Sequence, residues 1–278
     1  MRQHLLIPTD FSDNAWSAAM YAIKLYANVP CTYYFSHTWT FLNSGSRTYI
    51  SPSYLTPLKE KCKKQLEAVK EHAQKMSTNE DHQFETIYNE GELWDSIALA
   101  IKKHAIDLIV MGTKGATGAK KILLGSNAVT VINKIKRRPL LLVPNKCEYV
   151  TPKNILFPTD LSRTYGDELQ PLLKLAKLHN ALIDVLHIEG KEELSETQNK
   201  NLETLQGYLK DYEHRFNWLS EYDKKSTAIM DFIEQNDINV LSMINYEYSF
   251  IESLTKEPII KKIGFNSKIP FLVARRRE

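Results

Sequence analysis

The sequence predicts an α/β fold made of two tandem, doubly wound domains. The first observation is an internal repeat, because residues 5–12 recur as residues 155–162 at an offset of 150 without a gap. The second is that short apolar runs, typical of buried parallel strands, alternate with segments of helical periodicity in both halves. The third is the length of 278 residues, which exceeds one ordinary domain and suits two of roughly 140 residues.

The repeat continues along the chain and sets the order of the elements. Later segments align at smaller offsets, and the last pair is residues 139–143 with residues 270–274. Each half then reads as strand, helix, strand, long helix, strand, helix, strand, loop, helix and strand. This alternation predicts, in each half, a five-stranded, mainly parallel, Rossmann-like sheet with helices on both faces. We expect the domains at residues 1–146 and 152–278.

The individual elements follow from local patterns. The first half is longer in its middle, and the surplus falls in residues 39–57, where Gly, Ser and two prolines predict a loop. Residues 59–75 predict a solvated helix with alternating charge. Two further helices are predicted from apolar residues at helical spacing. Their apolar faces are Trp94, Ile97, Ala98 and Ile101 in one, and Ala128, Val131, Ile132 and Ile135 in the other.

The composition excludes several classes of partner. Lys plus Arg number 36 against 33 for Asp plus Glu, so no strong electrostatic field draws the chain to nucleic acid or to a membrane surface. No apolar run approaches the roughly 20 residues that span a bilayer, so we expect a cytoplasmic protein. The cysteines Cys31, Cys62 and Cys147 form no CxxC pattern, and we expect Cys31 to be a small buried thiol.

The most informative local feature is a glycine-rich window between a strand and a helix. Gly112, Gly115, Gly118 and Gly125 follow the strand-like run 107–111. Glycine lets backbone N–H groups approach a phosphate closely, and a helix that starts at the end of the window adds free N–H groups. The spacing fits neither GxxxxGK[ST] nor GxGxxG. The window therefore predicts a nucleotide pocket of another type.

Two polar residues beside this window have two interpretations each. Ser126 is a phosphate contact or a plain N-cap of the following helix, and the sequence does not separate these roles. Asp10 is a ligand contact or a cap of backbone N–H groups at a strand-to-helix turn. Asp160, its copy in the second half, favours capping because it persists where the glycines do not.

These residues resemble the universal stress protein family, whose ATP-binding members carry G-x2-G-x9-G-[ST]. Positions 112, 115, 125 and 126 match that pattern, and Pro8-Thr9-Asp10 and the run 107–115 complete the likeness. The whole chain resembles two tandem family domains, strongly in the first half and weakly in the second. The resemblance implies ATP as the ligand, accompanied by Mg²⁺ in solution without dedicated metal residues. The nucleotide-binding set that it implies is Pro8, Thr9, Asp10, Thr38, Met111, Gly112, Lys114, Gly115, Gly125, Ser126 and Asn127.

The resemblance also implies roles for members of this set. Asp10 would lie beside the adenosine and Met111-Gly112 near the ribose, while Gly115 and the residues 125–127 would surround the phosphates. Thr38 would line the adenine pocket, although the family usually carries an apolar residue there. Lys114 would neutralise phosphate charge or remain a solvated loop lysine.

The second half has lost this pattern. Ile244 and Glu247 replace the first two glycines, and Glu257-Pro258 falls near the position of Gly125-Ser126. Side chains would fill the phosphate space, the glutamates would repel phosphate, and proline would remove a donor. We therefore expect one ATP site in each chain.

Catalysis is not indicated by the sequence. His37 and His187 occupy equivalent positions, and we expect both to be structural. The leading hypothesis is a nucleotide-responsive regulatory module of the stress response. The alternatives are a weak ATPase or autophosphorylating enzyme, and an interaction scaffold without nucleotide. The apolar final strands, residues 139–143 and 270–274, would cover each other as an intrachain pseudo-dimer, and a homodimer of whole chains stays open.

Overall fold

The computed structural model describes residues 2–40, 51–113, 125–188, 193–219, 222, 224–244 and 269–275. The first half contains β1 (Gln3–Pro8), α1 (Asp13–Leu25), β2 (Cys31–Trp39), α2 (Pro52–Met76), β3 (Gln83–Glu90), α3 (Leu93–His104), β4 (Leu108–Gly112), α4 (Ser126–Lys134) and β5 (Leu140–Val143). The second half contains β6 (Asn154–Thr159), the 3-10 turn η1 (Asp167–Leu169), α5 (Gln170–His179), β7 (Leu182–Ile188), α6 (Glu196–Leu209), β8 (His214–Leu219), α7 (Lys225–Gln235), β9 (Val240–Ile244) and β10 (Phe271–Ala274).

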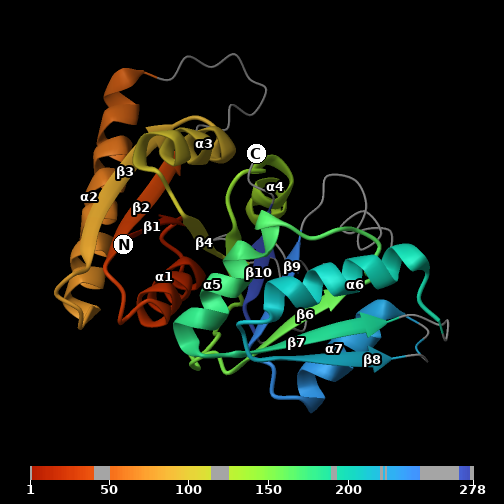
Figure 1. Ribbon diagram of the computed structural model, residues 1–278. Coiled ribbons are helices and arrows are strands. Elements are labelled where there is room, and N and C mark those ends of the chain that lie inside the picture. The colour runs from red at the N-terminus through yellow and green to blue at the C-terminus, as the bar shows by residue number, and fades with distance from the viewer. Residues whose placement is uncertain are drawn as a thin grey trace.

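The strands of both halves join into one twisted sheet (Figure 1). Its order is β3-β2-β1-β4-β5-β10-β9-β6-β7-β8, so each half has the same doubly wound order and the two meet at their last strands. β5 and β10 pair antiparallel, whereas every other pairing between described strands is parallel. The α/β class expected from the sequence is confirmed.

The internal repeat holds in the register of the strands. His4 lies opposite Thr32 where β1 meets β2, and Asn154 lies opposite Leu182 where β6 meets β7. Both pairs are related by the offset of 150 residues. Equivalent positions in the two halves can therefore be compared one by one.

Two apolar cores cover the two faces of the sheet. Side chains of α1, α2, α5 and α6 pack on one face, and side chains of α3, α4 and α7 pack on the other. Most residues of the inner strands are buried because helices lie on both sides, as expected for parallel sheets, whereas the edge strands β3 and β8 are partly exposed. Cys31 is fully buried at the start of β2, and this burial raises the pKa of its thiol to about 11.

Two features differ from the expectations. The expected loop at residues 39–57 is too long at both ends, because β2 includes Trp39 and α2 already begins at Pro52. Pro52 suits the first turn of a helix, where its missing N–H would have no partner, and Pro57 lies inside the helix. The second difference is that α5 begins at Gln170, although the equivalent of Asp13, the first residue of α1, is residue 163.

Candidate functional site

The candidate site lies at the carboxyl ends of β1 and β4, which are adjacent parallel strands in the first half. The ends of adjacent parallel strands meet at one edge of a sheet, and in doubly wound folds this edge holds the ligand. Pro8 ends β1, and Thr9 and Asp10 follow it directly, while Met111 and Gly112 end β4. The structure thus brings together the two segments that the sequence predicted to flank one site.

The turn between β1 and α1 is held by side-chain caps. The Thr9 Oγ1 accepts a hydrogen bond from the Phe11 N–H at 3.0 Å, and Phe11 adopts a left-handed φ of 65°. The Asp10 Oδ1 accepts hydrogen bonds from the Ser12 N–H at 3.1 Å and from the Ser12 hydroxyl at 2.6 Å. The capping role considered for Asp10 is therefore present, and its contact with a nucleotide stays a prediction.

Gly112 allows a close approach between β4 and α1. A β-carbon on Gly112 would lie 2.3 Å from Nδ2 and 2.8 Å from Cγ of Asn14, and 3.0 Å from the Asn14 carbonyl oxygen. Asn14 is buried in the first turn of α1. The glycine is thus required by packing between two protein segments, and it also keeps the end of β4 clear of a side chain.

The far end of the glycine window is tied to the end of β4. The Gly125 N–H donates to the Thr113 carbonyl at 2.6 Å, and the Thr113 N–H donates to the Val143 carbonyl at 3.0 Å. These bonds place the start of α4 beside the strand end. Lys114 and Gly115 lie outside the described residues, so their predicted contacts remain predictions.

The first turn of α4 is open to solvent. Gly125 is the N-cap, and Ser126 and Asn127 are the first two helical residues and are exposed. The interpretation of Ser126 as a plain N-cap is therefore wrong. Gly125 occupies the N-cap position, and Ser126 is already the first residue of the helix. Free N–H groups of this turn form a partly positive end that attracts an anion.

Thr38 and Met111 lie on the same face of the sheet. Alternation along β2 places Thr38 on the side of Tyr34, and both Tyr34 and Met111 belong to the core under α3 and α4. Thr38 is half-buried and pairs with Asn89 of β3. This face also carries the N-terminus of α4.

The second half repeats the turn without repeating the glycine at the strand end. The Asp160 Oδ1 accepts a hydrogen bond from the Ser162 N–H at 3.0 Å, as the Asp10 Oδ1 accepts one from Ser12 in the first half.

The two equivalent histidines make the same contact with this turn. The His187 Nδ1 is hydrogen-bonded to the Thr159 carbonyl oxygen at 3.0 Å, and the His37 Nδ1 to the Thr9 carbonyl oxygen at 2.8 Å. These contacts support a structural role for both histidines. β9 ends at Ile244, and Glu247, Glu257 and Pro258 lie outside the described residues.

The described part of the chain has neither a helix suited to a membrane nor a cluster suited to a metal ion. None of its helices is long and apolar enough to cross a membrane. Within the same residues, no group of three or more His, Cys, Asp or Glu side chains is arranged to hold a metal ion.

Asn14 packs on Gly112 in the candidate site and was not predicted from the sequence. It sits two residues after the Ser12 cap, where a polar side chain in a buried helical turn could have been noticed. Nothing in the spacing of the glycines reveals that its amide lies over Gly112, because this contact depends on the distance between α1 and β4.

Comparison with known proteins decides the family. The sequence model of the Universal stress protein family matches residues 1–144, which is half of the chain. The chain belongs to the universal stress protein family. It is 34% identical over 145 residues to a universal stress protein of Methanocaldococcus jannaschii, covering 50% of this chain and 80% of the relative.

Further relatives agree with this assignment. The universal stress protein YxiE of Bacillus subtilis is 30% identical over 95 residues, which cover 34% of this chain. The matched segment spans 64% of the length of YxiE. The crystal structure of a universal stress protein from Archaeoglobus fulgidus superposes with a TM-score of 0.76 at 18% identity, covering 99% of this chain and 97% of that chain. This last likeness is one of fold and extends over both halves.

Proposed function

We propose that this universal stress protein binds ATP at the carboxyl edge of its first half and acts as a nucleotide-responsive regulatory module of the stress response. One observation carries the proposal: the open first turn of α4 lies beside the glycine end of β4, next to the β1–α1 turn. Exposed N–H groups and the helix dipole suit the phosphates of a nucleotide.

The residues around this edge fit such a ligand. No side chain projects from the end of β4, because Gly112 packs directly on Asn14. Half-buried Thr38 and buried Met111 lie on the face that carries α4. Ser126 and Asn127 are exposed at the helix start and can donate to phosphate oxygens. We place Lys114 and Gly115 of the intervening loop at the phosphates as well, by resemblance to the family.

Binding is tested by the thermal stability of the full chain with and without ATP. At an ATP concentration of about 100 times Kd, occupancy should stabilise the binding unit by roughly 2.7 kcal/mol and raise its melting temperature. Gly115→Val should abolish this shift by filling the phosphate space. Absence of any shift in the unmodified chain would refute the proposal and favour a scaffold without nucleotide.

The number of sites is tested separately. We expect native mass spectrometry to show one nucleotide per chain. Glu247→Ala, in the second half, should leave the ATP-induced shift unchanged, and an effect equal to that of Gly115→Val would contradict the assignment of one site to the first half. Phosphate release faster than uncatalysed hydrolysis would move the protein from the binding class to the weak ATPases.

A further inference from the structure

A cavity lies in the first half between α1 and α2. Its volume is about 310 Å³, and its lining is mostly apolar, with Thr9 at the sheet. The apolar lining residues are Phe11, Ala15, Trp16, Ala19, Phe35, Ala68 and Val69. Helices α1 and α2 cover one face of the sheet and α3 and α4 cover the other (Figure 1). The cavity therefore lies on the face opposite α4, and Thr9 at the strand end belongs both to its lining and to the proposed nucleotide-binding set.

The lining of the cavity includes one pair of stacked rings and one carboxylate. The Trp16 and His72 rings stack with their centroids 4.4 Å apart, which joins α1 to α2 at one wall. Asp13 is exposed and is the one acidic side chain among the lining residues. A negative charge at the mouth and an apolar interior disfavour an anionic occupant.

The second half carries larger side chains after its equivalent turn. The two β-strand-to-helix turns are the same in their hydrogen bonds, since Thr159 Oγ1 accepts from the Leu161 N–H at 3.0 Å as Thr9 Oγ1 accepts from Phe11. At the offset of 150 in the sequence, Ala15 corresponds to Tyr165 and Ala19 to Leu169, although Ala15 lies in α1 and Tyr165 lies in the loop before η1. The first half therefore has two small residues where the second half has two large ones.

Tyr165 is buried in the second half and reaches the equivalent of Thr9. Its hydroxyl is hydrogen-bonded to the Thr159 Oγ1, and its ring packs edge-on against Phe157 at 6.0 Å. Leu169 is fully buried in the same apolar core. In the second half, a phenol ring of the protein itself is thus hydrogen-bonded to the turn threonine.

We propose that the cavity between α1 and α2 binds a small neutral phenol, whose ring takes the place of the Tyr165 side chain and whose hydroxyl bonds Thr9 Oγ1. The volume suits one substituted aromatic ring, because cavities near 150 Å³ hold benzene and ordinary ligand pockets begin at roughly 300 Å³. Phe11, Trp16 and Phe35 supply aromatic walls for such a ring. The Thr9 hydroxyl can donate to or accept from the phenol while it accepts from Phe11.

The test uses 4-methylphenol, which reproduces the tyrosine side chain, and toluene, which lacks only the hydroxyl. Isothermal titration calorimetry on the full chain without nucleotide should show saturable binding of one 4-methylphenol per chain, and toluene should bind about fivefold more weakly. Ala19→Leu installs the residue of the second half and should weaken 4-methylphenol binding at least tenfold. Ala98→Leu, an exposed site on α3, is the matched control and should bind as the unmodified chain does.

A second variant keeps the test independent of how well Ala19→Leu folds. Thr9→Val retains the shape of the side chain and removes its hydroxyl, so 4-methylphenol and toluene should then bind equally. The proposal is overturned by absence of saturable 4-methylphenol binding, by equal binding in the Ala19→Leu and Ala98→Leu variants, or by an unchanged preference over toluene in Thr9→Val. None of these outcomes depends on ATP, so failure here and failure of the nucleotide site are distinguishable.

Discussion

Asn14 lies so close to Gly112 that a β-carbon on the glycine would be 2.3 Å from the asparagine Nδ2. The first turn of α1 is therefore packed directly on the end of β4. Gly112→Ala should displace Asn14 and its backbone and lower the free energy of unfolding by about 1–3 kcal/mol, as overpacking does in other cores. Urea denaturation of the variant and the unmodified chain measures this difference.

Gly207→Ala is the matched control for this substitution. Gly207 is exposed inside α6, and a β-carbon there would meet nothing within 4 Å. Because alanine favours the helix, this variant should gain roughly 0.5–1 kcal/mol in the free energy of unfolding. An equal effect of the two substitutions would show that the contact with Asn14 is not what makes Gly112 necessary.

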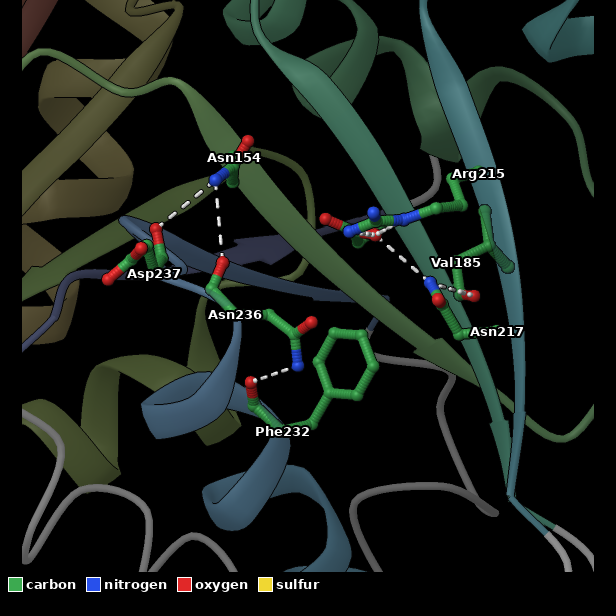
Figure 2. A network of polar contacts seen from close by, with 8 residues as sticks. Asn154, Val185, Arg215, Asn217, Phe232, Asn236 and Asp237 are labelled. Carbon is green, nitrogen blue, oxygen red and sulfur yellow. Dashed lines mark hydrogen bonds and ion pairs between the residues drawn. The ribbon is translucent and has the colours of Figure 1, made fainter.

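Arg215 forms an ion pair with the buried carboxylate of Asp184. Figure 2 shows Arg215 beside Asn217, the second residue that contacts this carboxylate. Asp184 is fully buried in β7, and its Oδ1 accepts from the Arg215 Nε at 2.8 Å and from the Asn217 Nδ2 at 3.0 Å. Arg215→Met would leave the buried charge without its cation. We expect a loss of about 2–3 kcal/mol in the free energy of unfolding, near the low end for buried pairs because the arginine is half exposed.

An exposed ion pair provides the comparison. On the surface of α2, the Lys63 Nζ lies 2.8 Å from the Glu60 Oε1, and both side chains are about half exposed. Lys63→Met should change the free energy of unfolding by less than about 0.5 kcal/mol. If Asp184→Leu combined with Arg215→Met remained as unstable as Arg215→Met alone, the uncompensated buried charge would not be the cause.

The features that the sequence predicts well are those carried by local pattern or by the repeat. The Pro-Thr-Asp turn, the order of the elements and the meeting of the two final strands all follow from short segments that occur twice. The late start of α5 does not follow from the repeat, because the equivalent residues of the first half are helical, although Gly166 disfavours a helix locally. Residues 163–166 are held instead in a loop by a hydrogen bond from the Thr164 hydroxyl to Asn201 of α6, 37 positions away.

Some residues of the candidate site could be predicted from the sequence, and others could not. Its glycines and the Asp10 turn are visible in the spacing of the sequence. The position of Asn14 and the cavity beside Ala15 and Ala19 are not, since both depend on the packing of α1 against other elements. The hydrogen bond of Tyr165 to Thr159, the equivalent of Thr9, is what suggests a ligand for that cavity.

His179 predicts a dependence of stability on pH. Burial lowers the pKa of His179, which lies at the end of α5, and a hydrogen bond to the Leu25 carbonyl of α1 offsets this only in part. The pKa in the folded state is thus below that in the unfolded state, near 6.5, so the unfolded state takes up the proton more readily. This contribution to stability is complete above about pH 6.5 and is lost as the pH falls through the folded pKa.

Urea denaturation between pH 5 and pH 7.5 measures this effect. His179→Gln should make the free energy of unfolding less dependent on pH over this range. The dependence should not vanish, because burial also lowers the pKa of His104. A dependence in His179→Gln identical to that of the unmodified chain would contradict the assignment.

The seam between the halves predicts the behaviour of the first half alone. β5 is almost fully buried, and its outer edge pairs with β10, with Leu142 opposite Phe271 and Leu140 opposite Val273. In the full chain this edge is covered. We propose that residues 1–146 form a domain, and a fragment of that length would leave the apolar edge of β5 bare, which favours pairing with another strand. The equivalent strand of a second fragment can supply the same antiparallel pairing. We expect size-exclusion chromatography with light scattering to give twice the mass of one fragment, and a folded monomer at tens of micromolar would contradict the pairing, and an unfolded fragment would contradict the proposed boundary.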